Sequence, residues 1–125
     1  MSRYVFLVLT NASAGRDDEF NEWYNHQHIP DVLKIPGFVA AQRFSLAGGQ
    51  MDDATSPWRY LALYELDTDD LAGALKELAA SVGTPAMVMS DSLNMNGIGT
   101  YVFSPIAERV VAGQAKLRKA PAGGC

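Results

Sequence analysis

The stretch that decides the fold is residues 19–44, which read EFNEWYNHQHIPDVLKIPGFVAAQRF. Phe20, Tyr24 and His28 follow one another at intervals of four residues, so on a helix their rings lie on one side. Pro30 has no backbone N–H and disfavours helical geometry in the residue before it, so we expect the helix to break there. The stretch therefore predicts a histidine at the end of a helix, on the side that packs against the rest of the protein.

The segments that flank this helix have the patterns of further regular structure. After the break, a short turn from Asp31 to Ile35 is expected to end at Pro36-Gly37, which is typical of a turn before a strand. Apolar and β-branched runs predict strands, and helical spacing after a cap at Thr68 predicts a second main helix. The expected strands are residues 3–10, 38–46, 58–67 and 98–103, and the expected helices are residues 17–28, 69–82 and a short one from Thr84-Pro85 to about residue 91.

The order of the main elements, βαββαβ, is that of a ferredoxin-like α+β fold with a four-stranded antiparallel sheet. Its two main helices cover one face of the sheet, yet the strands at residues 3–10 and 58–67 carry apolar groups on both faces. Leaving large apolar side chains in water would forgo about 1.5–3 kcal/mol each. We therefore expect a homodimer whose sheets pack face to face, and the alternative is a C-terminal tail that folds back as a lid. The domain is expected to span residues 1–106, followed by a tail, residues 107–125, that is weakly helical or disordered.

Composition narrows the function classes. The 125 residues are 48% hydrophobic and 19% charged, as in an ordinary globular domain, and the net charge of −4 argues against nucleic-acid binding. The single cysteine, Cys125, fits a reducing cytoplasm. Residues 4–14 resemble a secretory signal, but the apolar run is short and its removal would delete a strand, so we interpret it as a strand. No apolar run approaches the length needed to span a membrane.

A motif in the same stretch resembles the signature of the EthD-like branch of the dimeric α/β-barrel superfamily. It consists of Phe20, Trp23-Tyr24, His28, Pro30 and Pro36-Gly37-Phe38, and the resemblance extends over nearly residues 3–106. It implies a ferredoxin-like fold and a dimeric barrel. It leaves the activity open, because the superfamily includes methylmuconolactone isomerases, polyketide cyclases, cofactor-free monooxygenases, haem enzymes and proteins of unknown role. In the isomerases, a histidine at the end of the first helix carries a proton, and His28 is the matching residue.

His28 is the main catalytic candidate. A partly desolvated imidazole can take and return a proton near neutral pH, which contributes about 10²–10⁴-fold in rate when the group is well positioned. The alternative is a structural histidine whose Nδ1 holds the backbone freed at Pro30. Tyr24, one turn earlier, either orients His28 or is a core aromatic residue with its hydroxyl at the edge. His26 and His28 point in different directions on a helix, so we predict no metal site, and we expect no cofactor.

A further set of residues is expected to bind a small-molecule substrate, and each has a structural alternative. Arg43 could hold a substrate carboxylate or phenolate, or could reach solvent from the end of a strand. Methionines after the second helix could form an adaptable pocket wall or fill the core. The candidate substrate-binding residues are Trp23, Arg43, Tyr60, Tyr64 and Met87, with Met89 and Met95 as further wall residues.

These features predict a small cofactor-independent enzyme that acts on an apolar aromatic, lactone or polyketide-type metabolite. His28 would transfer a proton in an isomerase-, lyase- or dehydratase-like reaction. Two alternatives remain: a non-catalytic dimer that binds a small molecule or has an accessory role, and a cofactor-free oxygenase.

Overall fold

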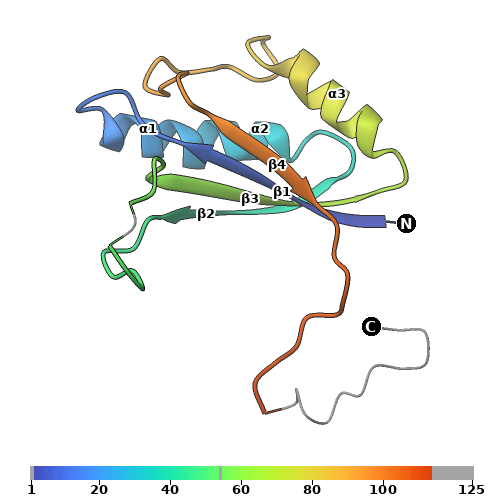
Figure 1. Cartoon of the computed structure of the whole chain (residues 1–125). Helices are drawn as coiled ribbons and strands as arrows, with labels where there is room; N and C mark the ends of the chain where they lie inside the picture. Colours follow the sequence, from blue (N-terminus) through green and yellow to red (C-terminus); the bar gives the residue numbers. More distant parts are fainter. Residues whose placement is uncertain (1, 54, 114–125) are drawn as a thin grey trace.

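The computed structural model describes residues 2–53 and 55–113 of the chain. Four strands form one antiparallel sheet in the order β2-β3-β1-β4, and the helices lie on one side of it (Figure 1). The elements in chain order are β1 (Ser2–Thr10), α1 (Asp17–Trp23), η1 (Tyr24–His28), α2 (Ile29–Val32), β2 (Phe38–Ser45), β3 (Tyr60–Thr68), α3 (Leu71–Ser81) and β4 (Gly99–Phe103). The ferredoxin-like α+β fold predicted from the sequence is confirmed.

The first helix continues through Pro30, so the prediction that the helix would break there is wrong. The chain stays helical to Val32, but residues 24–28 form a π-helical turn in which the N–H of Ile29 bonds to the carbonyl of Tyr24. A proline ring inside an α-helix clashes with the carbonyl four residues earlier. A wider turn before Pro30 separates the two groups, and a single π turn of this kind is a known feature of functional sites.

Two smaller expectations are also corrected. Residues 84–91 form turns and not a third helix, because the N–H of Met87 bonds to Thr84 and its carbonyl accepts from Gly83, which turns the chain back. β3 begins two residues later than expected and β4 one residue later. Just before these two strands, the ring N–H of Trp58 donates a hydrogen bond to the carbonyl of Gly97. Of the expected tail, residues 107–113 contain no helix, and residues 114–125, which include Cys125, lie outside the described part of the chain.

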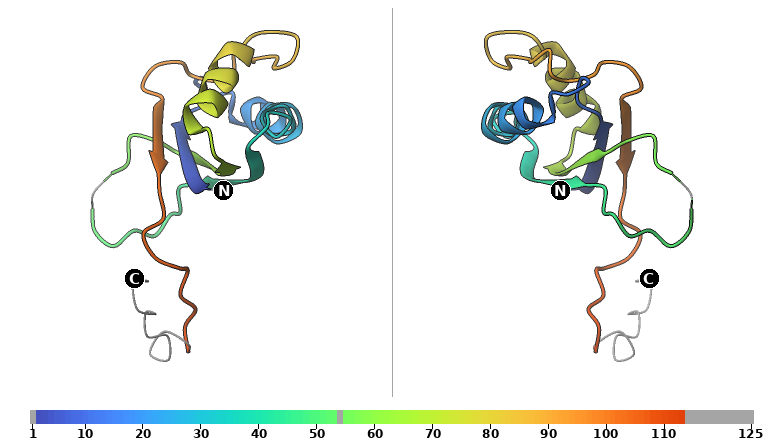
Figure 2. Two further views of the ribbon diagram at one scale, coloured as in Figure 1. Left: turned by 90° about the vertical axis from the view of Figure 1, so that its right-hand side faces the viewer. Right: turned by 90° about the vertical axis from the view of Figure 1, so that its left-hand side faces the viewer.

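The core lies between the sheet and the helices. Phe6 packs on Phe38 and Tyr64 with ring centroids 6.4 and 6.0 Å apart, and Phe20 packs on Tyr24 at 5.4 Å. Phe20, Tyr24 and His28 are all buried, as the four-residue spacing predicted. The sheet thus provides the floor beneath the helix that carries the histidine (Figure 2).

The opposite face of the sheet is apolar and uncovered by the described chain. Register places Leu7 between Leu63 and Tyr101, and Leu9 beside Leu61, all on this face. Residues 104–106 and Arg109 border a groove of about 540 Å³ at one edge of this face, and the chain then leads away from the sheet (Figure 1). Within the described residues no helix is long and apolar enough to cross a membrane.

Candidate functional site

A cavity of about 200 Å³ lies on the helix-covered side of the sheet. Its walls come from β1, the π turn, α2, β3, α3, the loop after α3 and the start of β4. The lining is mostly apolar. Its polar groups are the imidazole of His28 and the hydroxyls of two tyrosines and two threonines. The lining residues are Phe6, Val8, Thr10, Tyr24, His28, Val32, Tyr64, Leu78, Val82, Met89, Leu93, Met95, Ile98 and Thr100.

The imidazole of His28 is held between two aromatic side chains. Its ring stacks on Trp23, with centroids 4.8 Å apart, and meets the ring of Tyr24 edge-on at 5.0 Å. Its Nδ1 is buried and has no hydrogen-bond partner among the described residues. The structural role considered for this nitrogen, holding the backbone freed at Pro30, is therefore not seen.

Burial lowers the pKa of His28 to about 4, far below its ordinary value. The carboxylate of Asp31 raises this pKa, and the positive charge of Arg43 lowers it, but removal from water is the largest cause. The imidazole is consequently neutral at physiological pH. A neutral imidazole can accept a hydrogen bond or a proton from a molecule in the cavity. The titration near neutral pH expected from the sequence is wrong, however, because burial makes this imidazole a weaker base than a free one.

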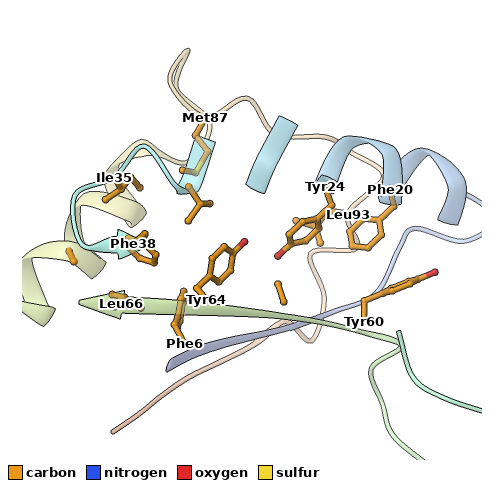
Figure 3. Close-up of a cluster of buried hydrophobic side chains, with 13 residues drawn as sticks. Phe6, Phe20, Tyr24, Ile35, Phe38, Tyr60, Tyr64, Leu66, Met87 and Leu93 are labelled. Atoms are coloured by element: carbon orange, nitrogen blue, oxygen red, sulfur yellow. The ribbon is translucent and has the colours of Figure 1, made fainter. Parts of the chain in front are cut away.

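Two tyrosines stand beside this imidazole. The hydroxyl groups of Tyr24 and Tyr64 point toward one another across the core (Figure 3), although the Tyr64 hydroxyl makes no well-formed hydrogen bond within the described chain. Burial raises the pKa of both hydroxyls above the ordinary tyrosine value. Both phenols therefore stay protonated at neutral pH and can donate a hydrogen bond to an oxygen atom.

Arg43 lies behind Tyr24 and does not line the cavity. Its guanidinium carbon is 4.3 Å from the centroid of the Tyr24 ring, and its Nη1 donates to the side-chain oxygen of Asn25 at 2.9 Å. Burial lowers the pKa of Arg43, and the neighbouring tyrosines oppose this effect. Its Nε and Nη2 find no hydrogen-bond partner among the residues described, so the aromatic faces are the main neighbours of this charge.

Three other predicted substrate-binding residues lie outside the cavity lining. The hydroxyl of Tyr60 donates to Asp17 at 2.5 Å and points away from the Tyr24–Tyr64 pair (Figure 3). The indole N–H of Trp23 donates to the carbonyl of Val88 at 3.0 Å, and Met87 is fully buried in the core. The structure brings together His28, Tyr24 and Tyr64 from the predicted set, with Met89 and Met95 from the methionine run.

The loop after α3 contributes cavity residues that sequence reasoning treated only in part. It is fixed to the loop after β1, where the N–H of Ser13 donates to the carbonyl of Ser92 at 2.6 Å and Arg16 pairs with Asp91 at 2.7 Å. Leu78 and Val82 follow one another at helical spacing, and that spacing is the sequence signal for their inward position. Thr10 ends β1 and Thr100 is near the start of β4. No sequence signal showed that both would line the cavity, because only the antiparallel pairing of the two strands brings them close together.

The described residues contain no group of three or more histidine, cysteine, aspartate or glutamate side chains placed to hold a metal ion. His26 is exposed on the helix surface and lies 3.6 Å from a carboxylate oxygen of Glu22. It does not line the cavity. The site is therefore built around one histidine and two phenols.

Solved structures share this fold. An EthD family protein from Bacillus halodurans has 21% sequence identity and a TM-score of 0.55, and the match covers 84% of this chain and 99% of that one. An EthD-like protein from Ralstonia eutropha has 13% identity and a TM-score of 0.58 (87% of this chain, 96% of that one). The heme-degrader MhuD from Mycobacterium tuberculosis, solved with two hemes in its active site, has 18% identity and a TM-score of 0.57 (86% and 99%).

The chain has the fold of the dimeric α/β-barrel proteins. At these identities the likeness shows the fold alone. The resemblance to EthD-like proteins seen in the sequence is thus confirmed at the level of the fold. No protein-family model matches the sequence, and the comparison with curated proteins found no significant match.

Proposed function

We propose that this protein is a small enzyme that transfers a proton on an apolar cyclic substrate, with His28 as the base. The observation that carries the proposal is a buried, neutral imidazole that lines an apolar cavity and has an unpartnered Nδ1. A buried polar atom without a partner is costly, and such groups occur where a ligand or a reaction requires them. The proposed class is an isomerase or lyase.

The residues suggest a two-step path. The imidazole of His28 takes a proton from a carbon next to a carbonyl group, and the electron pair moves onto the carbonyl oxygen to give an enolate. The hydroxyls of Tyr24 and Tyr64 donate hydrogen bonds to that oxygen. On a substrate with an adjacent double bond, the imidazolium then returns the proton to the far carbon of the conjugated enolate, which gives an isomer. On a substrate with a hydroxyl group next to the enolate, it gives the proton to that hydroxyl, which leaves as water and yields an unsaturated carbonyl compound. A dry cavity favours each step because it strengthens these interactions.

We propose that the reaction uses these side chains without a haem. The cavity of about 200 Å³ is smaller than the roughly 300–1,000 Å³ of common cofactor and drug-sized sites. A porphyrin exceeds this space, so the haem chemistry of MhuD does not transfer to this cavity. A cofactor-free oxygenase would need a substrate that itself reacts with oxygen, and oxygen consumption with hydroquinones is the assay that would reveal one.

Deuterium exchange tests the proposal before any product is identified. Cyclic ketones and lactones are incubated with the protein in deuterated water, and the incorporation of deuterium next to the carbonyl is followed by NMR. We expect His28→Ala to reduce the rate by about 10²–10⁴-fold. His26→Ala is the matched control, because His26 is exposed and outside the cavity. Exchange that persists within a few-fold in folded His28→Ala would remove the catalytic role and favour a non-catalytic binding protein.

We also propose a homodimer formed through the open face of the sheet, in a cytoplasmic protein. The face carries Leu7, Leu63, Tyr101 and Phe103, and the last two are about half exposed in one subunit. A second copy is the simplest cover for such a patch. Light scattering at micromolar concentration should give twice the mass of the chain, and Leu63→Glu should give the mass of one chain. A wild-type monomer would refute the dimer and leave the cavity chemistry untouched.

A further inference from the structure

We propose that the cavity binds a single uncharged ring that carries one hydroxyl or carbonyl group, as in a simple phenol or a cyclic ketone, with this oxygen beside His28. The inference rests on the proposed functional site, but it concerns binding alone and can be tested without turnover. It excludes fused-ring and anionic molecules as ligands of this cavity. Size, charge and the positions of the polar groups each support it.

Size limits the ligand to one ring. An apolar cavity of about 150 Å³ is sufficient to bind benzene, so about 200 Å³ accepts a ring with one or two small substituents. A second fused ring would have to project through the mouth of the cavity or displace its walls. The wall opposite the sheet is formed by the end of α3 and the residue that follows it, where Leu78 and Val82 both line the cavity.

Charge excludes anions. Among the described residues that line the cavity there is no arginine, lysine, aspartate or glutamate. The cation that contacts Tyr24, Arg43, is outside the lining and is already engaged by aromatic faces and by Asn25. A carboxylate entering the cavity would lose its water without gaining an ion pair, which strongly disfavours its binding.

The polar groups gather around His28. Its ring contacts that of Tyr24, whose hydroxyl faces the hydroxyl of Tyr64 (Figure 3). One ligand hydroxyl can donate to the imidazole and accept from a tyrosine at the same time. Apart from the hydroxyls of Thr10 and Thr100, the other walls supply apolar contacts. Val82 and Met95 are 43% and 69% exposed, which places them at the mouth.

Isothermal titration calorimetry on the full chain at neutral pH tests the inference with two matched pairs of ligands. Phenol against naphthol varies size, and benzyl alcohol against benzoate varies charge. We expect phenol and benzyl alcohol to bind and their partners to bind at least tenfold more weakly. Equal affinities within either pair would overturn the inference.

Variants locate the binding in this cavity. Leu78→Phe should weaken phenol binding at least tenfold, whereas Lys76→Phe, which adds the same ring at an exposed position of the same helix, should change it less than twofold. If Leu78→Phe fails to fold, as seen by circular dichroism, Val82→Phe at the mouth provides the same test. Tyr64→Phe should weaken phenol but not toluene. If folded Leu78→Phe or Val82→Phe binds phenol as tightly as wild type, the ligand does not bind in this cavity and the inference is refuted.

The outcome is separable from that of the proposed function. Selective binding without deuterium exchange would support this inference and refute catalysis by His28. Exchange together with tight naphthol or benzoate binding would support catalysis and refute the size and charge limits.

Discussion

The burial of His28 predicts a specific loss of stability in acid. Its pKa is about 4 in the folded protein and close to 6.5 in the unfolded chain. Because the folded value is the lower one, protons bind the unfolded chain more readily between these pH values. The stabilising contribution is therefore complete above pH 6.5 and is lost as the pH falls toward 4.

The magnitude follows from the two pKa values. The difference between 6.5 and about 4 corresponds to about 3 kcal/mol of unfolding free energy. His28 as a whole residue is only 9% exposed, so screening by solvent reduces this figure little. For a domain of this size about 3 kcal/mol is a large part of the total stability.

Urea unfolding at pH 7, 6, 5 and 4 measures the effect, with the protein concentration fixed because association would also change the midpoint. The carboxylates titrate in the same range, so the comparison is between variants. Wild type and His28→Gln should differ by about 3 kcal/mol in their change from pH 7 to 4, whereas His26→Gln should follow wild type because its side chain is exposed. Parallel curves for wild type and His28→Gln, or an NMR titration of His28 near 6.5, would refute the reasoning.

Three further predictions concern the residues around the site. Gly37→Ala should lower the free energy of unfolding by about 1–3 kcal/mol, because φ of Gly37 is +100° and the added Cβ would lie 3.3 Å from a threonine of β3. Gly48→Ala is the control: Gly48 has open space around it, so the same urea assay should show a change within about 0.5 kcal/mol. Asp70→Ala should lower the free energy of unfolding by about 1 kcal/mol, because the Asp70 carboxylate accepts a hydrogen bond from the N–H of Gly73 at the start of α3. A change near zero in thermal unfolding would show that this cap is dispensable. Arg43→Gln should raise the pKa of His28, and an NMR titration with an unchanged or lower value would contradict the electrostatic argument.

Periodicity in the sequence was sufficient for the fold because it reports which side of each element is buried. The spacing of Phe20, Tyr24 and His28 predicted their common face, and the apolar character of both sides of β1 and β3 predicted the uncovered face of the sheet. Residue type alone did not separate cavity walls from core. Met87 and Met89 differ by two positions in one loop, yet Met87 is in the core and Met89 lines the cavity, because the turns at residues 84–87 set the path of the chain.

The π turn links the proline to the site, and it was not predictable from helical spacing. Pro30 cannot accept a tight α-helical turn before it, yet Asp31 and Val32 are buried, and a helix that stopped at His28 would not deliver them to the core. One wider turn satisfies both demands. In the same turn Trp23 and His28, five residues apart, stack on one another, and the indole is fixed to the loop by its bond to Val88. The turn that accommodates Pro30 thus also places the imidazole against the indole at the cavity wall, where its Nδ1 has no partner among the described residues.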